Sequence, residues 1–122
     1  NHHCQSSDED VYAIGDCAEL DGVVQAYLEP IRRQVKALAS HLYSDSAVNF
    51  NLLPTLIKTK TPSLSIMLSP PLVATHGQWE SSVKIGENQK LLYKDGDDVS
   101  GFALSGDLVK SANQMYSDLY AS

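Results

Sequence analysis

The stretch QWESSVKIGENQKLLYKDG, residues 78–96, decides the fold. Apolar and polar residues alternate over Gln78–Ile85, which is the period of a half-exposed β-strand. Gly86-Glu87-Asn88 then predicts a hairpin turn into a second strand over Lys90–Lys94, and Asp95-Gly96 predicts a further hairpin turn. Three large apolar residues of the first strand are expected on one face: Trp79, Val83 and Ile85.

The sequence on either side of this stretch predicts the rest of the same sheet. Two strand-like segments precede it, one strand follows, and the chain continues into an amphipathic helix over Gly106–Tyr120. The three further strands are Thr55–Lys60, Ser63–Leu68 and Ser100–Ser105. Successive strands with tight turns favour antiparallel pairing. We therefore expect an α+β domain over residues 46–122, with a mainly antiparallel four- to five-stranded sheet covered by a C-terminal helix.

Residues 1–45 have a different pattern and are expected to belong to another domain. Val11–Ile14 is a short apolar run stopped by Gly15-Asp16, which suits a buried parallel strand. A parallel strand needs neighbours, so this segment is expected to complete a sheet encoded upstream. Glu29-Pro30 predicts the start of a helix, with proline at its first position. The apolar stripe of this helix is expected to contain Ile31, Val35, Leu38 and Leu42.

Composition excludes several classes of function. The 122 residues carry a net charge of −6, which opposes nucleic-acid binding. Apolar runs are too short for a membrane helix, and no signal peptide is recognisable. Cys4 and Cys17 form no CxxC pair, so reduced thiols in a cytoplasmic protein are expected. Neither His2-His3-Cys4 nor the Asp95–Asp98 cluster has the spacing of a metal site.

Two segments resemble a known family of flavoproteins. Val11–Glu19, an apolar strand ending in Gly15-Asp16, is similar to the second flavin-binding motif of FAD-dependent pyridine-nucleotide reductases. Tyr27–Pro30 and the following helix are similar to that family's next element. Within this family, the chain is most similar to the rubredoxin reductases. Three segments carry that resemblance: Lys58–Ile66, Gly77–Glu80 and Gly101–Gly106.

The resemblance implies which residues approach the cofactor, and none of them is catalytic. Gly15 and Asp16 would lie at the ribityl chain of FAD. Backbone at Glu29, Pro30 and Ile31 would line the ring, where the positive end of the helix dipole favours reduced flavin. Lys60 would stabilise anionic flavin or attract an acidic partner. Asp16 as a turn cap and Lys60 as a solvated strand lysine remain the alternatives.

The resemblance also implies a reaction that this chain cannot perform alone. The chain has no Gly-x-Gly-x-x-Gly fingerprint for FAD or NAD, so it is expected to be a C-terminal fragment without activity. The longer protein would pass electrons from NAD(P)H through FAD to rubredoxin or a similar small iron–sulfur carrier. The alternative is a dimerisation or partner-docking module of a related reductase with a ferredoxin-like acceptor, so a homodimer is left open.

Overall fold

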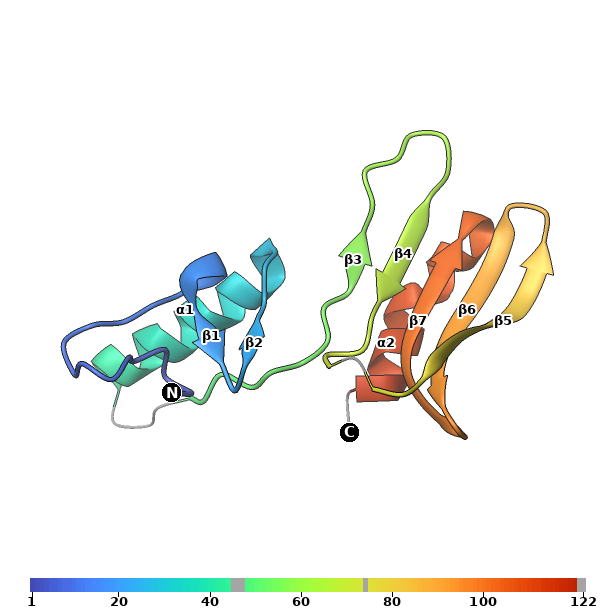
Figure 1. The fold of residues 1–122 in the computed structure, drawn as a ribbon. Helices are drawn as coiled ribbons and strands as arrows, with labels where there is room; N and C mark the ends of the chain where they lie inside the picture. The colour runs from blue at the N-terminus through green and yellow to red at the C-terminus, as the bar shows by residue number, and fades with distance from the viewer. Residues whose placement is uncertain (45–47, 74, 121–122) are drawn as a thin grey trace. The chain divides into compact units, whose positions relative to one another are not determined.

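The computed structural model describes residues 1–44, 48–73 and 75–120, drawn in Figure 1. These residues form two compact units, unit 1 (Asn1–Leu52) and unit 2 (Leu53–Ser122). The predicted boundary between residues 45 and 46 lies outside the described residues, so that domain assignment stays a prediction.

Unit 2 contains a five-stranded sheet in which every pairing is antiparallel. The strand order across the sheet is β3-β4-β7-β6-β5. The strands are β3 (Ile57–Lys58), β4 (Ile66–Ser69), β5 (Gln78–Ile85), β6 (Asn88–Asp95) and β7 (Asp98–Ser105). The predicted antiparallel sheet is therefore confirmed, and its three longest strands come from the two hairpins that residues 78–105 encode.

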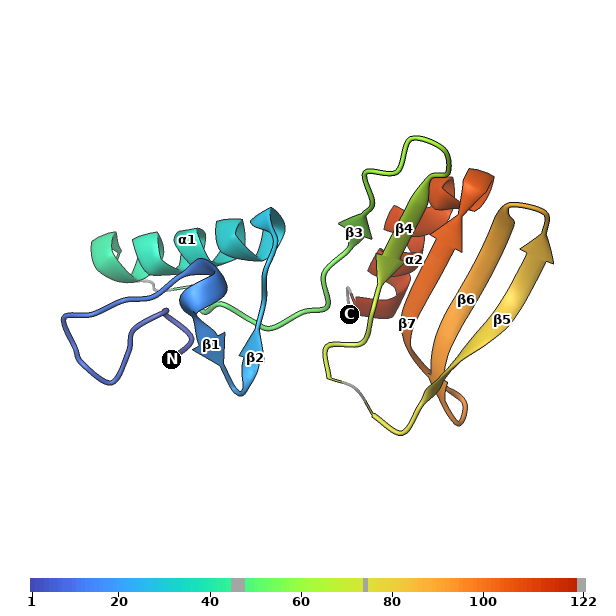
Figure 2. The same ribbon diagram turned by 45° about the horizontal axis from the view of Figure 1, so that its top comes forward.

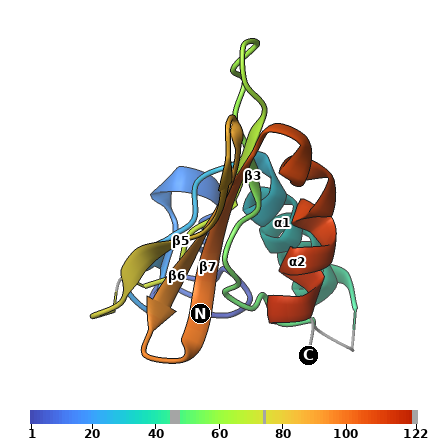
Figure 3. The ribbon, with the colours of Figure 1, turned by 90° about the vertical axis from the view of Figure 1, so that its right-hand side faces the viewer.

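Helical segments cover one face of this sheet (Figure 3). The chain leaves β7 into a 3-10 helix, η2 (Gly106–Ser111), and continues as α2 (Ala112–Tyr120). Phe102, Leu104 and Ala112 form the buried centre of the core, with at most 1% of each residue exposed. Partly buried residues around them are Leu56, Met67, Leu92, Leu108, Val109, Met115, Tyr116 and Leu119. The predicted covering helix is thus confirmed, although its first six residues have 3-10 geometry.

A β-bulge in β5 corrects one expectation about the faces of the sheet. Ser81 lies opposite Leu91 and Val83 lies opposite Lys90, so Ser82 has no partner in β6. The extra residue reverses the alternation of side chains along the strand. Trp79 therefore lies on the face away from the helices, whereas Val83 and Ile85 lie on the other face. The prediction that all three share one face was wrong.

Unit 1 is built from a small hairpin, a 3-10 turn and one long helix (Figure 2). Its elements are η1 (Gly15–Cys17), β1 (Glu19–Leu20), β2 (Val23–Val24) and α1 (Leu28–Tyr43). The β1–β2 turn is Asp21-Gly22, and both of these residues have positive φ, of 51° and 79°. An Asp-Gly turn of this kind is a strong hairpin signal, but this hairpin was not predicted.

The Val11–Ile14 segment does not form the expected strand. Within the described residues its β-pairing is one isolated antiparallel bridge, between Gln5 and Tyr12. Val11 is 51% exposed. The neighbour in this bridge is the short segment Cys4–Ser6. The Ser6 N–H donates to the Val11 carbonyl and the Ala13 N–H to the Cys4 carbonyl, both at 2.9 Å, so the pairing is antiparallel and too short to form a strand.

Helix α1 differs from its prediction in its start and in its buried face. It begins at Leu28, so Pro30 is the third helical residue, a position that still requires no intrahelical N–H bond. The buried residues are Pro30, Gln34 and Ala37. The predicted stripe is offset from these by one position, and its Val35 and Leu42 are about half exposed.

Candidate functional site

The structure brings the predicted residue Gly15 against helix α1. The Gly15 N–H donates a hydrogen bond of 2.7 Å to Oε1 of Gln34, a residue that is only 3% exposed. A Cβ atom at Gly15 would lie 3.6 Å from Cδ1 of Ile31. The φ angle of Gly15 is 78°, which favours glycine over any residue with a Cβ. Gly15 and Ile31 are therefore neighbours, as a shared site requires.

Asp16 is the second residue of η1, and it is exposed to solvent. An exposed carboxylate after a positive-φ glycine can accept hydrogen bonds from hydroxyl groups, so its chemistry fits a sugar-alcohol chain. The same position would also suit a turn residue without any ligand.

The first turn of α1 holds the other predicted residues of unit 1. Pro30 is buried, whereas Glu29 is exposed and forms an ion pair of 2.9 Å with Nε of Arg33. The residue before the helix, Tyr27, has a φ of 86°, and in the described part of the chain its side chain does not cap the helix. Uncapped N–H groups at a helix start attract electron-rich groups. The backbone of this turn therefore fits the pyrimidine edge of a flavin.

Lys60 lies in unit 2, in the turn between β3 and β4, and it is exposed. Two threonines order this turn. Oγ1 of Thr59 lies 2.8 Å from Oγ1 of Thr61, which donates to the Leu64 carbonyl at 2.8 Å. The structure thus brings Gly15, Glu29, Pro30 and Ile31 to the α1 region of unit 1, whereas Lys60 belongs to the other unit.

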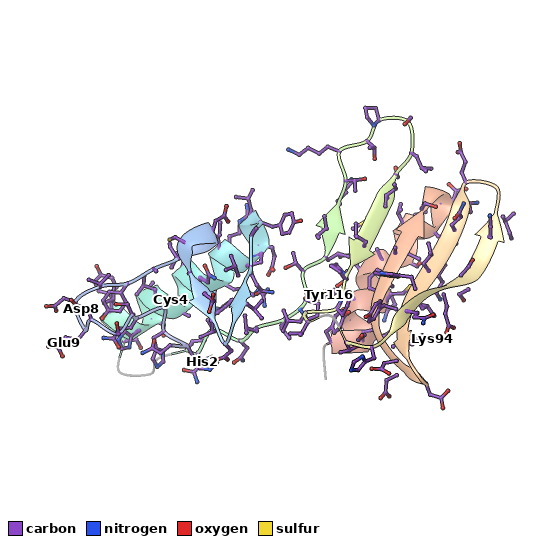
Figure 4. All side chains as sticks on the ribbon, in the orientation of Figure 1. His2, Cys4, Asp8, Glu9, Lys94 and Tyr116 are labelled. Carbon is purple, nitrogen blue, oxygen red and sulfur yellow. The ribbon has the colours of Figure 1, made fainter. Side chains whose placement is uncertain are left out.

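A hollow of about 450 Å³ in unit 1 was missed by the sequence analysis. Both thiols line it, since Cys4 and Cys17 lie on its wall together with Gln34 and Phe50. Figure 4 labels Cys4 on this unit. Burial raises the pKa of the Cys4 thiol, although the nearby N-terminal charge lowers it in part. None of the six predicted site residues lines this hollow, and the 13-residue spacing of the thiols matches no motif that could have indicated it.

A second hollow, of about 230 Å³, lies in unit 2 and was also missed. Its lining is mostly apolar and comes from β4, β6, β7 and the turn before β4. The residues that line it are Leu64, Ile66, Gln89, Leu91, Ala103, Leu104 and Ser105. The alternating pattern of β6 and β7 could have indicated an apolar second face, but the depth of a hollow depends on the turn that closes it.

Two further observations on the described residues concern metal binding and membrane insertion. No three His, Cys, Asp or Glu side chains among them are gathered as metal ligands. No described helix has the length and apolar character needed to span a bilayer.

Comparisons with known proteins identify relatives of this chain. A family profile described as the rubredoxin binding C-terminal domain matches residues 47–119. A rubredoxin-NAD(+) reductase of Alcanivorax borkumensis is 31% identical over 118 residues, which are 96% of this chain and 30% of that protein. Nitric oxide reductase FlRd-NAD(+) reductases of Aliivibrio fischeri and Escherichia coli are 31% and 33% identical, over 94% and 90% of this chain.

One solved structure has the same fold along almost the whole chain. It is the crystal structure of NADH:rubredoxin oxidoreductase from Clostridium acetobutylicum, with a TM-score of 0.68 and 18% sequence identity. The match covers 97% of this chain and 31% of that one. This chain therefore spans about a third of the length of its relatives.

Proposed function

This chain belongs to the rubredoxin-binding C-terminal domain family, and we propose that it is the C-terminal part of an FAD-dependent reductase that passes electrons from NAD(P)H to rubredoxin. The observation that carries the proposal is the alignment over 96% of the chain with a rubredoxin-NAD(+) reductase. The relatives are NAD(+) reductases, which supports NAD as the nicotinamide partner. The free thiols Cys4 and Cys17 suit a reducing, cytoplasmic compartment.

Binding to rubredoxin tests the partner. The chain would be immobilised and titrated with a purified rubredoxin at low ionic strength, where electrostatic attraction between electron-transfer proteins is strongest. We expect saturable, micromolar binding. A response that stays linear with rubredoxin concentration would contradict the proposal.

FAD is the cofactor that we propose for the longer protein, and the α1 region of unit 1 fits part of it. Asp16 would accept hydrogen bonds from the ribityl hydroxyls, and Gly15 would let the backbone come close to them. The N–H groups of the first α1 turn, at Glu29, Pro30 and Ile31, would face the ring. When bound, FAD accepts a hydride equivalent and releases electrons singly.

This chain alone is expected neither to hold FAD tightly nor to oxidise NADH. The residues that we propose to contact FAD would form only one side of a cofactor site, and no glycine-rich phosphate loop is present in the sequence. Mixing micromolar FAD with the chain should leave flavin fluorescence unchanged. Quenching that saturates with protein, and that is lost in Asp16→Ala, would instead mean that the chain holds a complete site.

Lys60 is the residue that we propose to act electrostatically. Its ammonium group is exposed on an ordered turn, where it can meet a carboxylate of the partner. Lys60→Gln should weaken rubredoxin binding at low salt and flatten its salt dependence. Lys110→Gln provides the matched control, because Lys110 in η2 is also exposed. Equal effects of the two changes would assign Lys60 no specific role.

The names of two relatives favour a second candidate for the acceptor. They are FlRd-NAD(+) reductases, so the electron acceptor would be FlRd or another small iron–sulfur carrier. Such an acceptor would bind to unit 2, as proposed for rubredoxin. Competition between the two carriers for the immobilised chain discriminates, because the physiological partner should displace the other. A homodimer is the remaining alternative, and light scattering after size-exclusion chromatography tests it directly.

A further inference from the structure

The sheet of unit 2 has a second face, opposite the helices, that carries apolar side chains. The register places Leu91 opposite Ala103, and Ala103 opposite Leu68, so these three residues share one face. Their neighbours Phe102 and Leu104 point to the helix-covered core. The second face therefore has an apolar surface that crosses β4, β7 and β6.

A loop covers one end of this face and leaves the other end open. The Tyr93 hydroxyl donates a hydrogen bond of 3.0 Å to the Thr75 carbonyl. A Cβ at Gly101 would lie 2.9 Å from Cδ of Pro71, which shows how closely the loop approaches β7. The 230 Å³ hollow lies at the other end, beside Leu64 and Ile66.

The size and lining of the hollow suit a protein side chain better than a small ligand. Its volume is below the roughly 300–1,000 Å³ of pockets that enclose drug-sized ligands. Leu64, Ile66, Leu91 and Ala103 make its wall mostly apolar. A hollow of this kind can receive one large apolar side chain of a partner, which is how the strongest contacts of protein interfaces are built.

Lysines flank the hollow on both sides. Lys84 in β5 is exposed and lies opposite Gln89, which lines the hollow. Lys60 follows Thr59, whose N–H donates to the Ile66 carbonyl at 3.0 Å. Two acidic residues lie at the same end: Glu87 in the β5–β6 turn, and Asp107, whose N–H donates to Oδ1 of Asn88 at 2.9 Å.

The charge of unit 2 as a whole also permits an acidic partner. Its sequence contains six lysines and seven acidic residues, whereas residues 1–52 contain three basic and eight acidic residues. Most of the net negative charge therefore lies in unit 1. An acidic protein meets less repulsion at unit 2 than at unit 1.

We propose that the hollow beside Leu64 and Leu91 is the docking point of rubredoxin, which inserts an apolar side chain while its carboxylates meet Lys84 and Lys60. This inference rests on the proposed function. The family match over residues 47–119 contains every residue that lines the hollow, which favours rubredoxin over other occupants. A second copy of this chain is the competing occupant.

Filling the hollow tests this docking point. Ala103→Leu adds a branched side chain inside it, whereas Asn113→Leu adds the same side chain at an exposed position of α2. Rubredoxin binding to each variant would be measured by titration, after circular dichroism has shown a native fold. We expect Ala103→Leu to raise the Kd by about tenfold or more, as loss of a central contact does. Asn113→Leu should leave the Kd unchanged.

Two further variants keep the test decisive. Leu64→Ala removes one wall of the hollow without adding volume, so it answers the question even where Ala103→Leu does not fold. Lys84→Glu should raise the Kd at low salt and less at high salt, because the added charge is screened. Lys110→Glu, in η2 on the helix side, is its control.

The outcomes separate this inference from the proposed function. Absence of rubredoxin binding by the unmodified chain overturns both. Normal binding that neither Ala103→Leu nor Leu64→Ala weakens overturns the docking point alone. Self-association of the unmodified chain that Ala103→Leu abolishes would assign the hollow to a second copy, and that result also overturns the inference.

Discussion

Single residues at the corner between the β5–β6 turn and η2 fix how the sheet of unit 2 joins its helices. The Asp107 N–H donates to Oδ1 of Asn88 at 2.9 Å, and the Ser105 hydroxyl donates to the Glu87 carbonyl at 2.6 Å. Gly106, between them, has a φ of 63°, and its backbone approaches Asn88 so closely that a Cβ would overlap the Asn88 side chain. This corner therefore requires glycine for two reasons, conformation and space.

Gly106→Ala is expected to destabilise unit 2 more than Gly96→Ala. Both glycines have positive φ, but a Cβ at Gly96 would meet open space. Conformation alone costs about 1–2 kcal/mol at either position, and overlap with Asn88 adds about 1 kcal/mol or more at Gly106. Urea unfolding followed by the fluorescence of Trp79, the one tryptophan of the chain, measures both. Equal losses would mean that the corner relaxes around the added methyl group.

Cys4 is expected to react slowly with thiol reagents. Burial raises its pKa, so a smaller fraction is thiolate at neutral pH. The Cys17→Ser variant isolates Cys4, and maleimide labelling should be slower in it than in Cys4→Ser. In the folded chain, labelling of Cys4 should accelerate only at a higher pH than in the chain unfolded by urea. A raised pKa stabilises the fold below the unfolded pKa, and this contribution is lost as pH rises through the folded pKa. Equal pH profiles in both states would contradict burial of this thiol.

At the scale of elements, α2 is attached to the sheet by more than its apolar face. The Tyr116 hydroxyl donates a hydrogen bond of 2.6 Å to the Pro54 carbonyl, just before β3. Figure 4 labels Tyr116 between α2 and the segment that leads into β3. The bond connects the last helix to the segment before the first strand of the unit, 62 residues earlier in the chain.

Tyr116→Phe should lower the free energy of unfolding of unit 2 by about 1 kcal/mol, the typical net value of one hydrogen bond. The ring keeps its packing, so only the hydroxyl is lost. Tyr43→Phe is the matched control, because Tyr43 is 89% exposed. Urea unfolding of both variants, again followed by Trp79 fluorescence, measures the difference. No change in Tyr116→Phe would mean that water replaces the bond without cost.

Elements with a clear period and glycine turns could be predicted from the sequence, and irregular ones could not. Strand β5 was predicted with the bounds that it has, because Gln78–Ile85 alternates and Gly86 ends it. The bulge at Ser82 was missed since Ser81-Ser82 offers two similar polar residues, and only pairing with β6 decides which one is extra. The start of α1 was missed because Tyr27 adopts a positive φ that its residue type does not indicate.

The candidate sites also divide into features that the sequence indicated and features that it did not. Gly15 was singled out by a motif in the sequence, whereas neither hollow could be predicted. Each hollow is lined by segments far apart in the chain, such as Leu64 and Leu91, and their approach depends on tertiary packing. The ligand-binding roles of Gly15, Asp16, Glu29, Pro30, Ile31 and Lys60 remain predictions.

At the scale of the whole molecule, the two units differ in how well each buries its own apolar residues. Unit 2 buries Phe102, Leu104 and Ala112 under two helical segments. Among the described residues of unit 1, the buried apolar side chains are Pro30, Ala37 and Phe50, while Leu28 is 72% exposed. Its strands contain two residues each. Unit 1 is therefore expected to be less stable on its own than unit 2.

Hydrogen exchange should reveal this difference. Amides of β6 and β7 are expected to exchange slowest, and those of α1 faster by about tenfold or more, because opening free energies follow buried contacts. Mass spectrometry of peptides from the exchanged chain measures both in one sample. Equal protection of α1 and β7 would show that the units unfold as one.

The edges of the unit 2 sheet restrict how any partner can be recognised. Strand β3 has only two residues, and β5 combines its bulge with Glu80 and Lys84, with Glu80 paired to Lys94 at 3.2 Å. Such edges resist the addition of a foreign strand. A partner protein must then be recognised by side chains on the faces of the sheet, because the sheet edges do not favour pairing with a strand of another protein. Point substitutions of these surface side chains should therefore change which partner is bound while the framework of the sheet stays the same.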